Sequence, residues 1–259
     1  PWVPEEIRAL AAFPNYLELA WPQLRPNLDQ AGFAFSAAFI ADRALDFARF
    51  FYEPTYTPDE IASAVGADRS ILRQTLRALH YGAPQVMLIA GALLEALKFE
   101  QAGGKGRAGD RDTGLGERMM RRAPVVVVEE YESAGDVEDV YRSIRSVTTL
   151  PYVPIEFRAI ARWPAYLRMA WDDLEHVITH PEYRLRRRSL SYYSAGGTHY
   201  FTHPVRLGRN ALRDAGMSHG DIDELKGTLE VFATATPAQL LNTVALEHAF
   251  NPRDVEVSH

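Results

Sequence analysis

The feature that most constrains this chain is an internal repeat. Residues 1–24, PWVPEEIRALAAFPNYLELAWPQL, align without a gap on residues 151–174, PYVPIEFRAIARWPAYLRMAWDDL, and 13 of the 24 pairs are identical. Repeats of this kind indicate a fold assembled from two similar units. One difference between the two copies bears on function. The first copy has Pro22 and Gln23 at the positions where the second copy has Asp172 and Asp173.

The likeness continues beyond these two segments. The same offset of 150 residues carries Tyr52 and Pro54 to Thr202 and Pro204. After a small insertion the offset becomes 153, and the correspondence runs on to about residue 253. We therefore predict a first helical repeat, a connecting segment and a second helical repeat, with the boundaries 1–100, 101–134 and 135–253.

The connecting segment differs in composition from both repeats. Residues 101–124 are rich in glycine and charge and poor in apolar residues, which predicts a flexible linker. Residues 135–147 carry apolar side chains at spacings of three and four, which predicts an amphipathic helix leading into the second repeat. The first repeat has no such helix before Pro1, and we expect a matching helix upstream of Pro1 in the natural chain.

Helical spacing dominates both repeats, and the four-valine run at 125–128 is the best strand signal. Pro14 and Pro164 stand where helices are expected to begin, and Thr57 and Asp68 are candidate N-caps. Further helices are expected over residues 44–51, 57–65, 68–79 and 84–99, with a turn at 80–85 between the last two. The expected architecture is all-α, with two similar helical bundles that pack as a pseudo-dimer.

Composition excludes several classes of function. The net charge of −6 gives no electrostatic basis for binding nucleic acid or an anionic membrane. The chain has no cysteine, which excludes disulfides, thiol nucleophiles and thiolate metal ligands. We find no apolar run long enough for a membrane span and no leader segment, so the cytoplasm is the default location.

A helical wheel separates the two acids of the second repeat. Leu167, Ala170, Trp171 and Leu174 share the apolar stripe, and Asp172 falls about 140° from Leu167 on the polar face. Asp173 falls at the rim of the stripe, where a carboxylate needs hydrogen bonds and is a candidate general base. The alternative is a surface aspartate paired with a neighbouring arginine, which is the commoner situation.

Other constellations favour surface roles. His176 and His180 have the spacing of metal ligands, but they lie on the polar face and Pro181 follows at once. The four arginines within residues 184–188 are typical of a solvated helix face. The sequence has no G-x-S-x-G motif after a strand and no phosphate-binding glycine motif, which argues against a serine hydrolase and a nucleotide cofactor. We expect no metal and no cofactor.

The run at residues 125–174, together with the tandem layout, resembles the DehI-type 2-haloacid dehalogenases. The resemblance covers essentially the whole chain. It implies an all-helical pseudo-dimer with a site between the halves. It also implies hydrolysis in which an Asp-activated water displaces halide from C2 with inversion, without an ester intermediate.

The resemblance also assigns residues. The catalytic Asp maps to Asp173, and Trp21 maps to a tryptophan that lines the substrate pocket. Family members also use an Asn late in the first repeat to hold the water, and this chain has none there. The predicted pocket residues are therefore Trp21, Trp171, Tyr81, Gly82, Ala83 and Gln85.

The predicted function is a cofactor-independent hydrolase acting on a 2-haloacid or a related small carboxylate, with homo-oligomerisation left open. Two alternatives remain at this point. One is a family member that binds or hydrolyses another small carboxylic acid. The other is a non-catalytic helical binding protein.

Overall fold

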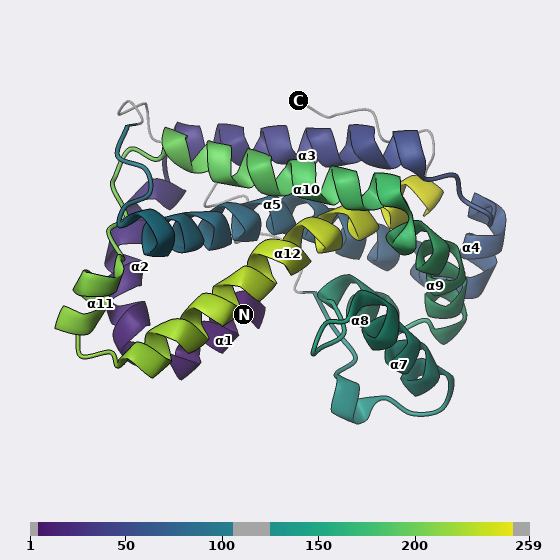
Figure 1. Cartoon of the computed structure of the whole chain (residues 1–259). Helices are drawn as coiled ribbons and strands as arrows, with labels where there is room; N and C mark the ends of the chain where they lie inside the picture. Colours follow the sequence, from purple (N-terminus) through teal and green to yellow (C-terminus); the bar gives the residue numbers. More distant parts are fainter. Residues whose placement is uncertain (1–4, 106–124, 251–259) are drawn as a thin grey trace. The chain divides into compact units, whose positions relative to one another are not determined.

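The structure, a computed structural model, describes residues 5–105 and 125–250 (Figure 1). Its helices are α1 (Glu5–Ala9), α2 (Pro14–Leu28), α3 (Ala31–Phe51), α4 (Pro58–Val65), α5 (Arg69–Phe99), α7 (Asp136–Thr148), α8 (Ile155–Ile160), α9 (Pro164–Thr179), α10 (Pro181–Gly197), α11 (Arg209–Asp214) and α12 (His219–Phe250). Four 3-10 turns accompany them, η1 (Leu10–Ala12), η2 (Gly66–Asp68), η3 (Glu130–Glu132) and η4 (Thr198–Tyr200).

The all-α prediction is confirmed, because the described residues form no extended strand. An antiparallel bridge joins Ala102 to Val205, with both backbone N–H to O distances at 2.8 Å. The valine run that gave the best strand signal is not a strand, and Val128 instead donates a backbone hydrogen bond to the carbonyl of Arg158. The described ends of the predicted linker thus make specific contacts, while residues 106–124 lie outside the described residues.

The described chain divides into two compact units. Unit 1 contains residues 5–40, 82–105 and 189–237, and unit 2 contains residues 41–81, 125–188 and 238–250. Each unit therefore takes segments from both sequence repeats. The long helices α3, α5, α10 and α12 each contribute one part to unit 1 and the other part to unit 2.

Unit 1 holds the helix α2, which carries the first tryptophan repeat. The loop at residues 201–206 is fixed against α2 by the side-chain amides of Gln23 and Asn27. The Asn15 side chain donates to the carbonyl of Ala215 after α11, which lies beside α2 in Figure 1. Unit 1 therefore anchors a helix of the first repeat to segments of the second.

Unit 2 is built around α9, the helix of the second tryptophan repeat. Helices α7, α8 and α4 all pack against α9 (Figure 1). The core of unit 2 is continuous from the end of α3 through α9 to the end of α12, and its fully buried aromatic side chains include Tyr141, Phe157 and Tyr166. This core sets the position of every side chain on the inner face of α9.

The turn predicted at residues 80–85 is wrong. Helix α5 continues through Pro84 from Arg69 to Phe99. A proline inside a helix removes one backbone donor, and the sequence pattern favoured a break. Burial on both sides of the proline, at Ala83, Met87 and Leu88, stabilises the helix in spite of that lost bond.

Some predicted helix starts are confirmed, but the helix expected over residues 44–51 is the end of α3, which begins at Ala31. Pro14 and Pro164 are the first residues of α2 and α9. Thr57 caps α4 in a complete capping box with Glu60. Asp68 ends a 3-10 turn, and its carboxylate accepts a hydrogen bond of 3.2 Å from the indole N–H of Trp163.

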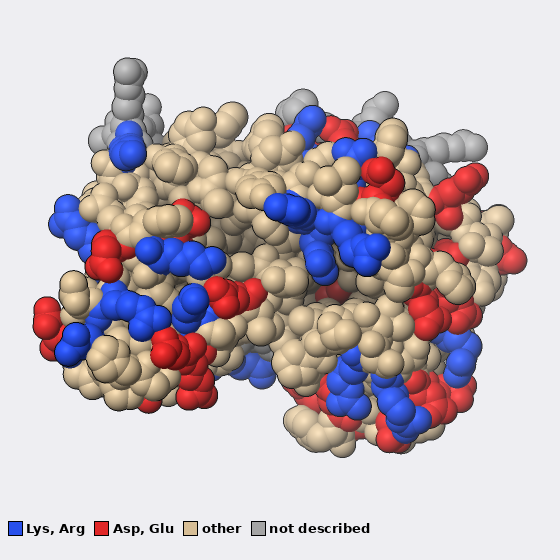
Figure 2. Space-filling model, in the orientation of Figure 1, with Lys and Arg blue, Asp and Glu red and all other residues tan. Residues whose placement is uncertain are grey.

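Charged side chains of both signs are interspersed on the face in Figure 2, and basic ones gather over part of α10. Part of this basic group is packed, because Arg186 lies over the rings of Phe47 and Phe50.

Among the described residues, the helical stretch 58–99 is long and apolar enough to cross a membrane by length and composition. More than half of the most apolar 18-residue part of this stretch is buried inside the protein.

Candidate functional site: the Asp173 carboxylate

The two acids of α9 have different surroundings, as the helical wheel predicts. Leu167, Trp171 and Leu174 are buried, whereas Asp172 is exposed and Asp173 is half-buried. Asp173 therefore stands at the edge of the core of unit 2 and remains partly accessible to solvent.

Two donors from the loop between α3 and α4 bind the Asp173 carboxylate. The hydroxyl of Tyr52 donates to Oδ2 at 3.0 Å. The backbone N–H of Thr55 is shared between Oδ2 at 3.2 Å and Oδ1 at 3.3 Å. Because Oδ2 accepts two hydrogen bonds and Oδ1 only a shared one, Oδ1 has the greater remaining capacity to accept a proton.

Local sequence explains why this loop reaches α9. Helix α3 ends at Phe51, and Pro54 keeps the following residues from continuing it. The capping box of Thr57 then fixes the direction in which α4 begins. The backbone direction of residues 54–57 is thus fixed at both ends of this segment. In this conformation the N–H of Thr55 points toward Asp173.

Two further tyrosines lie within the electrostatic reach of Asp173. Tyr166 is buried on α9, and its hydroxyl has no hydrogen-bond partner among the described residues. Burial, and then the charge of Asp173, raise the pKa of Tyr166. Partial burial, and then the charges of Asp172 and Asp173, raise the pKa of Tyr56. Of these phenols, only that of Tyr52 binds the Asp173 carboxylate directly.

Trp171, predicted to line the pocket, lies in the core of unit 2. It is 3% exposed, its ring packs edge-on against Phe157 at 5.5 Å, and its N–H donates to the hydroxyl of Ser143 at 3.0 Å. These contacts hold the turn of α9 that carries Asp173.

The other predicted pocket residues divide between the units. Tyr81 belongs to unit 2, is 43% exposed and stacks on His80. The remaining four belong to unit 1, where Trp21 is 45% exposed and two side chains are buried. These four are Trp21, Gly82, Ala83 and Gln85. Their role in a pocket stays a prediction.

Gln23 of unit 1 stands at the position in the repeat that Asp173 occupies in unit 2. Its Oε1 accepts from the backbone N–H of Arg206 at 2.7 Å, and its Nε2 donates to the carbonyl of Arg206 at 3.3 Å. Nε2 also donates to the carbonyl of Leu19 at 2.9 Å. Each repeat thus uses the same helix position to bind the backbone of a loop after the helix α3 or α10.

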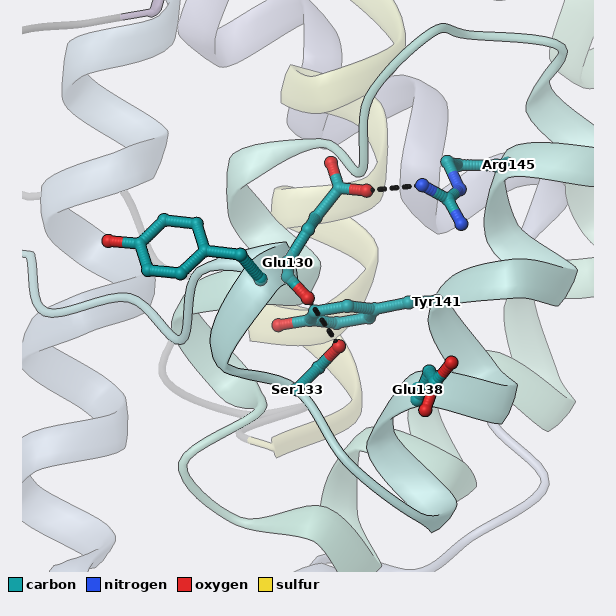
Figure 3. Close-up of a pocket in the computed structure, with 6 residues that line it drawn as sticks. Glu130, Ser133, Glu138, Tyr141 and Arg145 are labelled. Atoms are coloured by element: carbon teal, nitrogen blue, oxygen red, sulfur yellow. Dashed lines mark hydrogen bonds and ion pairs between the residues drawn. The ribbon is translucent and has the colours of Figure 1, made fainter.

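A polar pocket of about 270 Å³ lies elsewhere in unit 2, between η3 and α7 (Figure 3). Its central acid, Glu130, is already paired with Arg145 at 2.7 Å and accepts from the N–H of Val153 at 2.7 Å. The hydroxyl of Ser133 donates to the Glu130 carbonyl, and no histidine lines the pocket. With its acid neutralised, this pocket is a weaker candidate for catalysis than Asp173.

No group of three or more histidine, aspartate or glutamate side chains suited to a metal ion lies within residues 5–105 and 125–250. His180, one of the two histidines with ligand-like spacing, accepts the backbone N–H of Glu182 on its Nδ1 at 3.2 Å. It therefore caps the start of α10.

Comparison with known proteins places the chain in a family. Residues 1–150 match the family described as "Halocarboxylic acid dehydrogenase DehI". The chain belongs to the DehI family. Among the curated DehI relatives, the (R)-2-haloacid dehalogenase of Pseudomonas putida is 26% identical over 251 residues, which are 93% of this chain and 81% of that protein. A configuration-inverting 2-haloacid dehalogenase of Pseudomonas sp. (strain 113) is 29% identical over 71% of this chain and 62% of its own.

Solved structures of similar fold agree with the DehI assignment. A D-2-haloacid dehalogenase mutant in complex with D-2-CPA superposes with a TM-score of 0.88 at 24% identity, covering 96% of this chain and 87% of its own. Another mutant D-2-haloacid dehalogenase structure has a TM-score of 0.84 at 25% identity, with the same coverage. The helical fold described above is therefore the DehI fold along nearly the whole chain.

Sequence reasoning missed the residues that hold Asp173. It looked for an asparagine near Gly82 and Ala83, but the polar groups that contact the carboxylate are the hydroxyl of Tyr52 and the N–H of Thr55. The alignment of Tyr52 with Thr202 in the repeat was a usable signal. Like Asp173 and Gln23, this pair differs between two otherwise similar copies.

Proposed function

We propose that the protein is a 2-haloacid dehalogenase that hydrolyses the carbon–halogen bond with Asp173 as general base. The observation that carries the proposal is the half-buried Asp173 carboxylate, whose Oδ2 accepts two hydrogen bonds while Oδ1 accepts only a shared one. Membership of the DehI family and the names of the curated relatives support the choice of a 2-haloacid as substrate.

In the proposed step Asp173 takes a proton from a water molecule as the water oxygen attacks C2. The new C–O bond forms as the C–halogen bond breaks, and the halide leaves with the bonding electron pair. Attack opposite to the leaving group inverts C2, which agrees with the configuration-inverting relatives. A 2-hydroxyacid and halide are formed, and the proton on Asp173 passes to solvent. No cofactor takes part in this chemistry.

Halide release from D- and L-2-chloropropionate tests the proposal. We expect release with at least one enantiomer from the parent protein, and a loss of at least 10²-fold in Asp173→Asn, in the range for removing a general base. Asp172→Asn is the matched control, because Asp172 is the exposed neighbour on the same turn. Absence of halide release by the parent protein from both enantiomers would refute the activity.

Isotope labelling distinguishes direct attack by water from an ester intermediate. In a single turnover in H₂¹⁸O, direct attack places the label in the hydroxyacid and leaves peptides that contain Asp173 unlabelled. An attack by the carboxylate itself would place ¹⁸O in the Asp173 side chain after several turnovers. Mass spectrometry of the peptide that spans α9 reads both outcomes.

We also propose that the two sequence repeats form equivalent halves of a pseudo-dimer. The matched contacts of Gln23 with Arg206 and of Asp173 with Thr55 support this equivalence. Each contact joins a helix of one repeat to a loop of the other. The exchange of segments also accounts for compact units that do not follow the repeat boundaries.

A further inference from the structure

We propose that Tyr52 is a positioning residue for catalysis. Together with the N–H of Thr55, it holds Oδ2 of Asp173 and so directs Oδ1 toward the reacting water. This inference rests on the proposed function, because it assigns Tyr52 a part in the reaction that Asp173 carries. Tyr52 acts through Asp173 and takes no part in bond making.

The geometry of the hydrogen bonds is the first support. A carboxylate on a helix rotates about its side-chain torsions unless its oxygens are held. Here Oδ2 accepts from the Tyr52 hydroxyl at 3.0 Å and from the Thr55 N–H at 3.2 Å. Two donors on one oxygen fix the orientation of the whole carboxylate plane. A base held in this way presents its other oxygen at a constant position.

The rigidity of Tyr52 is the second support. The ring is 4% exposed and belongs to the same core as Tyr166 and Trp171. Burial, and then the charge of Asp173, raise the pKa of Tyr52. The hydroxyl is therefore a neutral donor at neutral pH.

The internal repeat gives an independent third support. Unit 1 has Gln23 at the place of Asp173, and Thr202 aligns with Tyr52. Gln23 binds both the N–H and the carbonyl of Arg206, one position beyond the equivalent of Thr55. The loop that contacts the acid Asp173 therefore begins with a tyrosine. The loop that contacts the amide Gln23 has a threonine, Thr202, at the equivalent position. A tyrosine needed only for the loop conformation would be expected in both.

The variant Tyr52→Phe tests the proposal because it removes one donor and keeps the ring in the core. We expect kcat for 2-chloropropionate to fall about tenfold or more, as for the loss of one hydrogen bond to a charged group, with KM changed less than threefold.

Tyr141→Phe is the matched control. Tyr141 is 1% exposed in the same unit, and its hydroxyl donates to the carbonyl of Val128 at 2.9 Å, away from Asp173. Both variants lose one tyrosine hydroxyl from one core, so a general loss of stability would affect them alike. If Tyr52→Phe and Tyr141→Phe have the same kcat and the same KM, the positioning role is overturned.

A second measurement separates this inference from the proposed activity. The ¹³C carboxyl signals of labelled aspartate can be compared at one fixed pH, with Asp173 assigned by the loss of its signal in Asp173→Asn. We expect the chemical shift of the Asp173 carboxyl to change in Tyr52→Phe, which removes a donor from Oδ2, and to stay constant in Tyr141→Phe. An unchanged chemical shift in Tyr52→Phe overturns the positioning role even if the parent protein releases halide. Failure of halide release alone would refute only the proposed activity.

Discussion

The hydroxyl of Tyr52 lies 3.0 Å from Oδ2 of Asp173, although 121 residues separate them in the chain. The contact joins the end of α3, in the first sequence repeat, to α9, in the second. The local surroundings of the proposed base thus depend on both repeats at once. Neither repeat on its own would supply both the carboxylate and its donors.

Two tyrosines at equivalent positions of the repeat carry buried hydroxyls. Tyr16 and Tyr166 are both buried, and their hydroxyls lack hydrogen-bond partners among the described residues. A buried hydroxyl without a partner costs desolvation energy, so we expect Tyr16→Phe and Tyr166→Phe each to leave the free energy of unfolding unchanged or to raise it by up to about 1 kcal/mol. Urea unfolding measures the change. A loss of more than about 1 kcal/mol in either variant would contradict the expectation for that tyrosine.

Alkaline pH is expected to destabilise the fold through its buried phenols. Burial raises the pKa values of Tyr16, Tyr52, Tyr166 and Tyr183 above that of an unfolded tyrosine, about 10. Below pH ~10 their contribution to stability is fully present, and it is lost as pH rises toward the folded values, because the unfolded chain then binds fewer protons.

The free energy of unfolding should therefore fall above pH 10 by up to about 1.4 kcal/mol per pH unit for each such tyrosine. Urea unfolding between pH 8 and 11.5 measures this slope. Tyr166→Phe should reduce the slope by about one proton, whereas replacing the exposed Tyr192 should not change it. A slope that is the same in both variants would show that Tyr166 ionises freely in the folded protein.

The two repeated tryptophans should respond differently to truncation. Trp171→Ala removes a 3%-exposed ring from the core of unit 2 and should cost about 3–5 kcal/mol of the free energy of unfolding. Trp21→Ala removes a ring that is 45% exposed and should cost about 1–2 kcal/mol. If Trp21 lines the substrate pocket, its variant should show a raised KM. Denaturant unfolding and haloacid kinetics on the same samples separate the two effects.

The exchange of segments between repeats predicts how fragments behave. Since each compact unit contains parts of both repeats, residues 1–105 and 125–259 expressed separately should each lack cooperative unfolding. Mixed, they should recover helical circular dichroism and a single unfolding transition. A cooperative transition from either fragment alone would show that one repeat folds independently.

Much of the fold could be predicted from local patterns. The spacing in residues 135–147 predicts α7, and Thr57 with Glu60 marks the start of α4. Pro84 led to the wrong prediction of a turn, because a proline breaks a helix only where packing on both sides of it does not stabilise the helix. In α5 the buried residues on both sides oppose a break, and burial is a property of the folded chain.

The candidate site was predictable in its acid and not in its donors. Asp173 is marked by its own helix periodicity and by its difference from Gln23 in the repeat. The N–H of Thr55 carries no sequence signal, since every residue except proline has one. Tyr52 differs from its repeat equivalent Thr202, but that difference does not show which residue Tyr52 contacts, because the contact with Asp173 joins one repeat to the other.

The Gln23 side chain uses its oxygen and its nitrogen on the backbone of Arg206 and Leu19. A carboxamide committed in this way cannot accept a proton from water, and it stays uncharged at all pH values. Under the proposed function, the duplication therefore supplies one base and not two. In an active-site titration the protein should show a stoichiometry of one base per 29.1 kDa chain, with the tryptophan helix of the first repeat, α2, serving as a pH-independent anchor.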